Sequence, residues 1–263
     1  MGSVTGYKKL MLGQFMHKNR TVNMSKAVST KTIWPDALTL SQAAANLIVL
    51  ESNKAVIQKG YFTIALSGGS TPKILFELLA QPPYKNNIPW KKVFVAFGDE
   101  RFVAPTSEEN NYKMANDALL KHVAVPKKNI FRIPTVKVSP SQSAAIYEAT
   151  IRKHISSKHP FDLVLLGIGE EGHTASIFPK SPLLIDKKHW IQNVWVAEKN
   201  MDRISFTLPF INQAKNIAFL VSGESKAAIV KKIFSKSGAA LPAAMVKAKE
   251  NTFWFLDEAA CSG

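Results

Sequence analysis

The segment GIGEEGHTASIFP, residues 167–179, carries one histidine and two carboxylates directly after an apolar run. An imidazole titrates near neutral pH, so His173 is suited to move a proton during catalysis. Glu171, two residues earlier, is close enough along the chain to set the tautomer of that imidazole. No second His or Cys lies at metal-ligand spacing from His173, so the segment predicts an acid–base histidine and no metal site.

A second polar segment, SGGSTP at residues 67–72, follows a predicted strand and opens a predicted helix. Gly68 and Gly69 let the backbone approach a ligand, and the free amides and dipole of the helix N-terminus attract an anion. Ser70 and Thr71 add hydroxyl donors. The pattern suits a phosphate monoester, the alternative being a tight turn with a Ser/Thr helix cap. The motif GxxxxGK[ST] is absent, so a nucleoside triphosphate is not implied.

A third polar segment, GDERFVAP at residues 98–105, is expected to form a loop after another predicted strand. Arg101 can bind a phosphate with two parallel hydrogen bonds, and Asp99 and Glu100 can orient it. The alternative is a surface salt bridge without function. Arg203 and Lys226 are two further cationic residues. Each can either reach the same end of the sheet as Arg101 or be a solvated surface charge.

Apolar, β-branched or aromatic runs alternate with segments of helical period along most of the chain. Strands are expected at 61–67, 91–98, 129–134, 161–167, 191–198, 203–209, 216–223 and 251–256, and helices at 38–60, 71–80, 108–123, 141–157 and 224–235. This order predicts an α/β fold with a mostly parallel sheet and helices on both faces. Ligands of such sheets bind beyond the carboxyl ends of the strands, where the three polar segments are expected to converge.

Composition and charge narrow the function classes. The chain has 263 residues, 46% of them hydrophobic, and a formal net charge of +15. Its lysines are scattered, without a stripe of basic and aromatic residues, so we expect anionic substrates and no nucleic acid. A single cysteine, Cys261, points to a reducing compartment, here the cytoplasm. No apolar run approaches the roughly 20 residues that cross a bilayer, so no membrane partner is expected.

The chain is expected to have two parts. Residues 1–34 contain basic but no acidic residues, the first acidic residue being Asp36, and they lack the apolar core of a secretory signal. We interpret them as a disordered extension, and the alternative is an organelle transit peptide. Residues 35–263 show no internal repeat, linker or shift in composition, which favours a single α/β catalytic domain.

The motifs together resemble the 6-phosphogluconolactonase family. The similar segments are ALSGGSTP, FGDERFVAPTSEENNYKMANDALL, FDLVLLGIGEEGHTASIFP, RISFTLPFINQAKNIAFLVSGESKAAIV, LPAA and WFLDEAA. The resemblance implies a Rossmann-like sheet related to that of glucosamine-6-phosphate deaminase. It also implies hydrolysis of 6-phosphogluconolactone to 6-phosphogluconate in the pentose phosphate pathway, without metal or organic cofactor.

The resemblance also implies roles for individual residues. His173 corresponds to the general base of the family, and Glu171 stands where the family usually has Asp. The phosphate and substrate contacts implied are Gly68, Gly69, Ser70, Thr71, Asp99, Arg101, Gly172, Arg203 and Lys226. The partner is then a phosphorylated sugar lactone, and the chain is expected to be a monomer or a weak homo-oligomer.

Two other functions stay open. A glucosamine-6-phosphate deaminase or isomerase has a similar fold, but that family resembles DEY and HIAFNEP where this chain has DER and HTASIFP. A non-catalytic sugar-phosphate sensor would keep the phosphate segment and need no base such as His173. Both alternatives are separable by assay.

Overall fold

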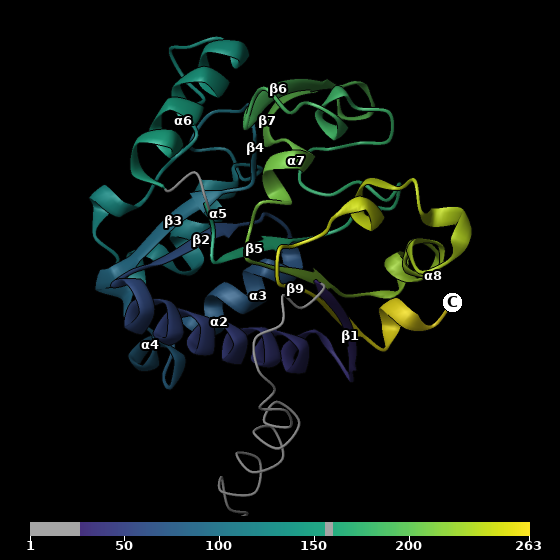
Figure 1. Ribbon diagram of the computed structural model, residues 1–263, viewed down its shortest axis with the longest axis horizontal. Helices are drawn as coiled ribbons and strands as arrows, with labels where there is room; N and C mark the ends of the chain where they lie inside the picture. Colours follow the sequence, from purple (N-terminus) through teal and green to yellow (C-terminus); the bar gives the residue numbers. More distant parts are fainter. Residues whose placement is uncertain (1–26, 156–159) are drawn as a thin grey trace, which may run out of the picture.

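The computed structural model describes residues 27–155 and 160–263, which form two β-sheets and the helices around them (Figure 1). The larger sheet has six strands, all parallel, in the order β1-β9-β8-β5-β2-β3. Its strands are β1 (Val28–Trp34), β2 (Phe62–Leu66), β3 (Val93–Phe97), β5 (Leu163–Leu166), β8 (Asn216–Val221) and β9 (Asn251–Asp257). The smaller sheet is antiparallel, in the order β4-β7-β6, with β4 (Asp99–Arg101), β6 (Ile191–Val196) and β7 (Met201–Phe206).

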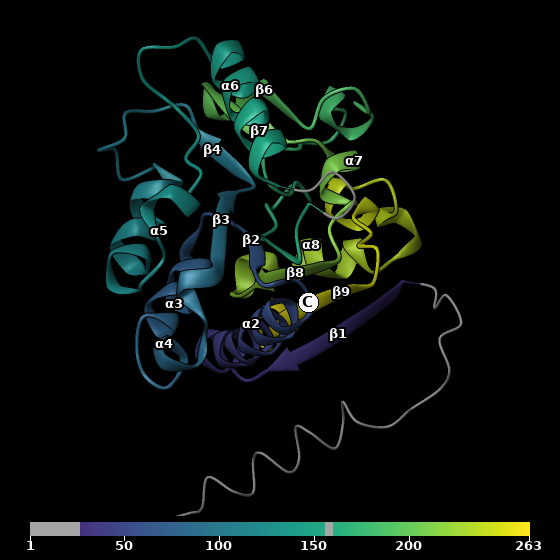
Figure 2. The ribbon, with the colours of Figure 1, turned by 60° about the vertical axis from the view of Figure 1, so that its left-hand side comes forward.

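Helices cover both faces of the larger sheet, as the alternating pattern predicted (Figures 1 and 2). The helices are α2 (Ala37–Lys59), α3 (Ser70–Leu79), α4 (Tyr84–Asn87), α5 (Asn111–Ala118), α6 (Pro140–His154), α7 (Leu208–Ile211) and α8 (Ala227–Ile233). α2 and α3 pack together on one face, and α6, α7 and the smaller sheet lie on the other. Because both faces are covered, the central strands β2, β5 and β8 are buried along their whole length.

The strand order places a binding crevice at the carboxyl end of β2. From β2 the chain moves to β3 on one side, then returns across β2 to β5, β8 and β9 on the other. The connections after β2 and β5 therefore run in opposite directions and leave a crevice between them, where ligands of such sheets bind. The segments that begin at Ser67 and Gly167 follow β2 and β5 directly, so both meet at this crevice.

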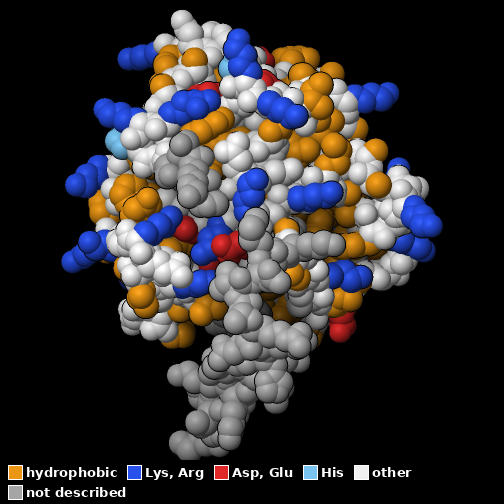
Figure 3. All heavy atoms as spheres, viewed as in Figure 1, with side chains coloured by type: hydrophobic (Ala, Val, Ile, Leu, Met, Phe, Trp, Pro, Cys, Tyr) orange, Lys and Arg blue, Asp and Glu red, His pale blue; other side chains and the backbone are white. Residues whose placement is uncertain are grey.

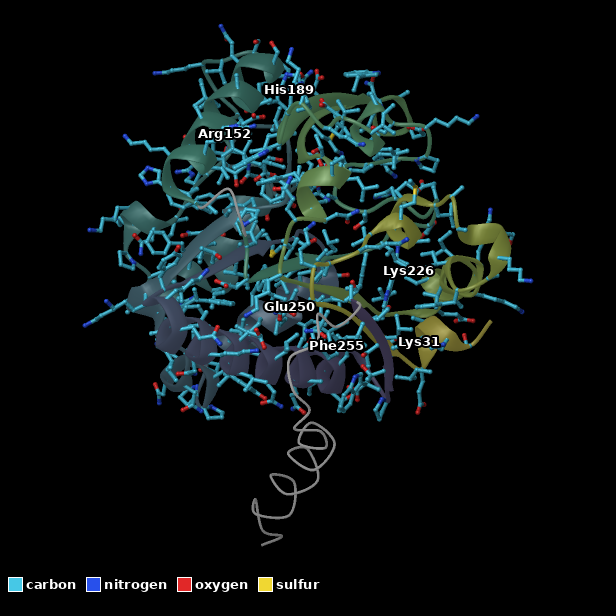
Figure 4. The ribbon with its side chains drawn as sticks, in the orientation of Figure 1. Lys31, Arg152, His189, Lys226, Glu250 and Phe255 are labelled. Carbon is cyan, nitrogen blue, oxygen red and sulfur yellow. The ribbon has the colours of Figure 1, made fainter. Side chains whose placement is uncertain are left out.

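The smaller sheet is fixed to α6 by one carboxylate and one guanidinium. Glu148 accepts hydrogen bonds from the amides of Trp190 and Ile191, at 2.9 and 3.0 Å. Arg152, one turn along α6, lies 3.9 Å from the centre of the Trp190 ring. Figure 4 labels Arg152 on α6 and His189 before β6, at the same end of the molecule. These contacts hold β6 and β7, and therefore Arg203 on β7, in place.

The N-terminal boundary of the fold lies earlier than the sequence predicted. Residues 28–34, assigned to a disordered extension, form strand β1, which pairs in parallel with β9 from Val28 opposite Asn251 to Trp34 opposite Asp257. The strand is mostly exposed at the edge of the sheet, so it lacks the apolar run by which the other strands were recognised. The prediction for residues 1–26 lies outside the described residues.

Two other local predictions were wrong. Residues 129–134 do not form a strand: Ile130 makes one isolated bridge to Val95, and the chain then continues without further pairing. The DER segment is not a loop but strand β4, because Gly98 ends the pairing with β2 and β4 then pairs with β7. Arg101 and Asp99 therefore stand on a strand, which orients them more firmly than a loop does.

The surface agrees with the charge pattern of the sequence. On the face shown in Figure 3, Lys and Arg side chains are spread singly over the molecule and do not form a continuous stripe. Within residues 27–155 and 160–263, no helix combines the length and the apolar character needed to cross a bilayer.

Candidate active site

His173 is held in one orientation by a carboxylate and an aromatic ring. Its Nδ1 lies 3.0 Å from Oε2 of Glu171, and its ring stacks on Phe178 with 4.1 Å between ring centres. The loop also closes on itself, since the amide of Gly169 donates to the carbonyl of His173 at 2.9 Å. With Nδ1 bonded to Glu171, Nε2 is the nitrogen left to accept a proton from water or substrate.

Burial and neighbouring charges set the protonation of this pair. Burial lowers the pKa of His173 below its usual 6.5, and the charge of Arg203 lowers it further, while Glu171 and Asp99 act to raise it. Burial acts to raise the pKa of Glu171, but hydrogen bonds from its own backbone amide and from His173 outweigh it and leave that pKa lowered. At neutral pH the pair is therefore a neutral imidazole beside a carboxylate, which is the form of a general base.

A buried serine connects the histidine loop to β4. Ser176 is fully buried and donates from Oγ to Oδ2 of Asp99 at 2.7 Å. Its amide donates to Oγ of Ser205 on β7, the residue opposite Asp99 in the small sheet. Asp99 is thereby held beside both His173 and Arg203, whose pKa values its charge raises.

Two arginines lie side by side on the smaller sheet. Arg101 and Arg203 are directly opposite each other on β4 and β7. In the described part of the chain neither forms an ion pair, and the Nε atoms of both are buried without a hydrogen-bond partner. Burial lowers the pKa of Arg203, with Asp99 opposing this and Arg101 adding to it. Two adjacent, partly desolvated guanidinium groups repel each other unless anionic groups bind to them, so the pair fits a negatively charged ligand.

The segment after β2 presents the backbone amides at the start of α3. Gly69 has a φ of 111°, which an L side chain rarely adopts, and it caps α3 without a side-chain hydrogen bond. No acidic residue lies in the first turn of α3, so its amides stay available to an anion. Thr71 is buried, and its hydroxyl lies 2.6 Å from that of Ser222, whereas Ser70 is exposed. Ser70 and the amides are thus more accessible than Thr71.

A cavity of about 530 Å³ lies between α3 and α5 and joins the glycine segment to one of the arginines. Gly69, Ser70, Arg101 and Asn111 line it, whereas His173 and Arg203 are not among its lining residues. Arg203 is near both Arg101 and the histidine, because it is the register neighbour of Arg101 and lies 6.0 Å from the Phe178 ring on which His173 stacks. The site therefore has a glycine–arginine end and a histidine end.

Two predicted site residues remain, Lys226 and Gly172. Lys226 is half-buried, ends a 3₁₀ turn before α8 and has no side-chain hydrogen bond or ion pair within the described ranges. Figure 4 shows Lys226 beside α8, on the other side of the molecule from Arg152. The carbonyl of Gly172 accepts from Ala243, and a side chain at Gly172 would meet Leu241, so this glycine packs against the LPAA segment.

Three contributing residues were missed or undervalued in the sequence. Phe178 stacks on His173 and lies 6.0 Å from the guanidinium of Arg203. Asn111 donates to the carbonyl of Asp99 at 3.0 Å. Glu100 is 1% exposed, and burial raises its pKa to about 7 against three amide hydrogen bonds that lower it. The alternation of side chains along a strand was the signal in the sequence that could have identified Glu100. It places Glu100 on the opposite side of β4 from Asp99 and Arg101.

A side chain at Gly169 is expected to displace the histidine. A Cβ added there would overlap the His173 ring. We expect Gly169→Ala to lower kcat by about 100-fold, the usual effect of a displacement of about 1 Å in a catalytic group. Gly167→Ala is the matched control, because its Cβ would meet nothing within 4 Å. Equal kcat values for the two variants would show that the orientation of His173 does not matter.

The strand order and the position of the functional side chains identify the type of fold. A fully parallel sheet that reverses its strand order at β2, with helices on both faces and the functional side chains at the reversal, is a Rossmann-like α/β fold. Residues 35–254 match the model of the family described as glucosamine-6-phosphate isomerases/6-phosphogluconolactonase. The chain belongs to this family.

Individual relatives agree with this assignment. A 6-phosphogluconolactonase from Nostoc is 38% identical over 238 residues, covering 88% of this chain and 96% of the relative. One from Haemophilus influenzae is 41% identical over 204 residues, covering 75% and 85%. The structure of 6-phosphogluconolactonase from Trypanosoma brucei superposes with a TM-score of 0.78 at 26% identity, covering 90% and 99%. A monomeric glucosamine-6-phosphate deaminase shares the fold, with a TM-score of 0.71 at 21% identity, covering 90% and 99%.

Proposed function

We propose that the protein hydrolyses 6-phospho-D-glucono-1,5-lactone to 6-phospho-D-gluconate, with His173 as general base. The observation that carries this proposal is the order of groups along the site. An oriented, neutral imidazole lies at one end. At the other end lies Arg101, which forms no ion pair with the residues that the structure describes, beside the exposed amides at the start of α3. A phosphorylated sugar lactone has the matching order, with an ester carbonyl at one end and a phosphate at the other.

In the proposed binding mode the phosphate lies at the glycine–arginine end. Arg101, Ser70 and the amides at the start of α3 hold it there, with Lys226 as a further cation. Arg203 and Asp99 flank the sugar, since both lie on the small sheet beside Arg101 and both are near the histidine loop. The lactone carbonyl then faces His173.

The proposed reaction needs one base and a positioned water. Nε2 of His173 takes a proton from the water as its oxygen attacks the lactone carbonyl. Arg203 stabilises the oxyanion of the tetrahedral intermediate that forms. The bond from the former carbonyl carbon to the ring oxygen then breaks, and His173 returns the proton to that oxygen. The products are the carboxylic acid, which ionises in water, and a free hydroxyl group.

The carboxylate of Glu171 is expected to set the acid limb of the pH–rate profile. His173 must be neutral to act as a base, so kcat/KM should fall as the pH drops through its pKa, which lies below 6.5. Glu171 acts to raise that pKa, and Glu171→Gln is therefore expected to move the acid limb to lower pH. The maximal kcat should also fall by about tenfold or more, because the tautomer is less well fixed.

The test of this prediction is a profile of kcat/KM against pH for both proteins. Glu170→Gln, at the exposed neighbouring glutamate, is the matched control and should leave the acid limb in place. An acid limb that moves to higher pH in Glu171→Gln would contradict the assigned pairing.

The rival functions differ in what they consume. A deaminase would release ammonia from glucosamine 6-phosphate, and a sensor would bind sugar phosphates without turnover. We favour hydrolysis because the named relatives of 38% and 41% identity are lactonases, whereas the deaminase shares only the fold.

Parallel assays decide between these functions. The protein is incubated with 6-phosphogluconolactone and, separately, with glucosamine 6-phosphate, and lactone loss and ammonia release are followed. We expect rapid lactone loss and no ammonia. Ammonia release would favour the deaminase, and binding of 6-phosphogluconate without turnover of either compound would favour the sensor.

The cellular setting follows from the reaction. We propose a place in the oxidative branch of the pentose phosphate pathway and in the cytoplasm, as the single cysteine of the chain suggests. We further propose one catalytic domain over residues 35–263, extended by β1, that acts as a monomer or a weak homo-oligomer without metal or organic cofactor.

A further inference from the structure

We propose that Glu100 is a positioning residue that fixes Arg101 and the start of α5 in the geometry that binds the phosphate group. This inference rests on the proposed function, because it assigns a role within the same site. Glu100 does not itself face the ligand. It acts through the backbone of the residues that do.

The position of Glu100 separates it from the binding surface. Side chains alternate along a strand, so Asp99 and Arg101 share one side of β4 while Glu100 takes the other. Asp99 contacts the histidine loop through Ser176, and Arg101 lines the cavity. Glu100 is 1% exposed beneath them and turns toward α5.

Three backbone amides donate to the Glu100 carboxylate. Oε1 accepts from Arg101 at 2.9 Å and from Asn111 at 2.7 Å, and Oε2 accepts from Tyr112 at 2.9 Å. Asn111 and Tyr112 are the first two residues of α5, so the carboxylate also lies at the positive end of that helix. One side chain thereby fastens a helix terminus to the strand that carries Arg101.

The fastened helix terminus in turn orients the phosphate-binding groups. The guanidinium of Arg101 donates to the carbonyl of Glu109, two residues before α5, at 2.7 Å. The side chain of Asn111 donates to the carbonyl of Asp99 and packs so closely on Gly68 that no Cβ fits there. A shift at the start of α5 would therefore move Arg101 and the glycine segment together, and both belong to the phosphate end of the site.

The test uses Glu100→Gln, which keeps the size of the side chain but replaces one accepting oxygen by a donor. We expect KM for 6-phosphogluconolactone to rise about tenfold, the effect of weakening one hydrogen bond to a charged group. We expect kcat to change by less than about threefold, because a lost contact made equally in substrate and transition state appears in KM alone. The kcat/KM for unphosphorylated gluconolactone should stay within about twofold of wild type, since that lactone has no phosphate to position.

Two further variants keep the result interpretable. Glu51→Gln is the matched control: Glu51 is 8% exposed and accepts from Asn216 at the amino end of β8, away from the site. Glu100→Asp keeps the charge with a shorter reach, and its KM should lie between those of wild type and Glu100→Gln. It also serves as the test variant if Glu100→Gln does not fold.

The outcomes separate the two proposals. An unchanged KM for the phosphorylated lactone in a folded Glu100 variant overturns the positioning role and leaves the proposed function intact. The same holds for an equal loss of kcat/KM with both lactones, which would mean that Glu100 is only structural. A wild-type protein that does not prefer the phosphorylated lactone overturns the proposed function, and this inference with it.

Discussion

Replacing His173 with alanine is expected to lower kcat for 6-phosphogluconolactone by about 10²–10⁴, the usual contribution of positioned acid–base catalysis. The variant loses the group that deprotonates water and protonates the ring oxygen. The residual rate comes from positioning by the phosphate contacts, which the substitution leaves in place. Because the His173 side chain is only 18% exposed and stacks on Phe178, the melting temperature of the variant is measured as well, so that a loss of catalysis is separated from a loss of stability.

The matched control is His189→Ala. His189 also pairs through Nδ1 with a carboxylate, Asp186, at 2.9 Å, but it lies in the segment before β6. Steady-state kinetics with the lactone in excess compares the two variants. A wild-type rate in His173→Ala, or an equal loss in His189→Ala, would remove His173 as the base.

Replacing Arg101 with alanine is expected to raise KM for the phosphorylated lactone by about 10- to 100-fold, as for loss of hydrogen bonds to a charged ligand. The effect should be large because no ion partner among the described residues competes with the ligand for this guanidinium. Unphosphorylated gluconolactone should be hydrolysed equally poorly by wild type and variant, since it lacks the group that Arg101 binds.

Lys59→Ala is the control for this prediction. Lys59 pairs with Asp162 at 2.9 Å and lies over the Tyr61 ring, at the amino ends of β5 and β2, so its loss affects stability and not substrate capture. KM is measured for both lactones with both variants. An unchanged KM for the phosphorylated lactone in Arg101→Ala would contradict the placement of the phosphate.

The sequence predicted the parallel sheet because its buried strands are apolar along almost their whole length. It predicted the convergence of the polar segments because the carboxyl ends of parallel strands lie at one edge of a sheet. Buried runs such as residues 163–166 and 216–221 are apolar throughout, and the segments that follow them had to meet at one edge. β1 was missed because an exposed edge strand needs no apolar run. Residues 129–134 show the opposite case: their apolar side chains are buried or half-buried, but the segment forms no strand.

The relations between segments could not be read from local pattern. Arg101 and Arg203 are 102 positions apart, and only the register of β4 and β7 places them opposite each other. The role of Glu100 depends on where α5 begins, which the sequence did not define to a single residue. Glu171 is a further case: the resemblance implies an Asp at this position, and only the structure shows that the longer side chain reaches Nδ1 of His173 at 3.0 Å. The longer side chain therefore still orients the imidazole.

We propose that this chain accelerates hydrolysis of 6-phosphogluconolactone through His173. The most direct test of this proposal follows loss of the lactone with no protein, with wild type and with His173→Ala, at a pH where spontaneous hydrolysis is slow. We predict a rate proportional to wild-type concentration and a rate for the variant, at equal concentration, reduced by about 10²-fold or more. Loss of the lactone no faster with wild-type protein than without protein would show that the protein is not a lactonase.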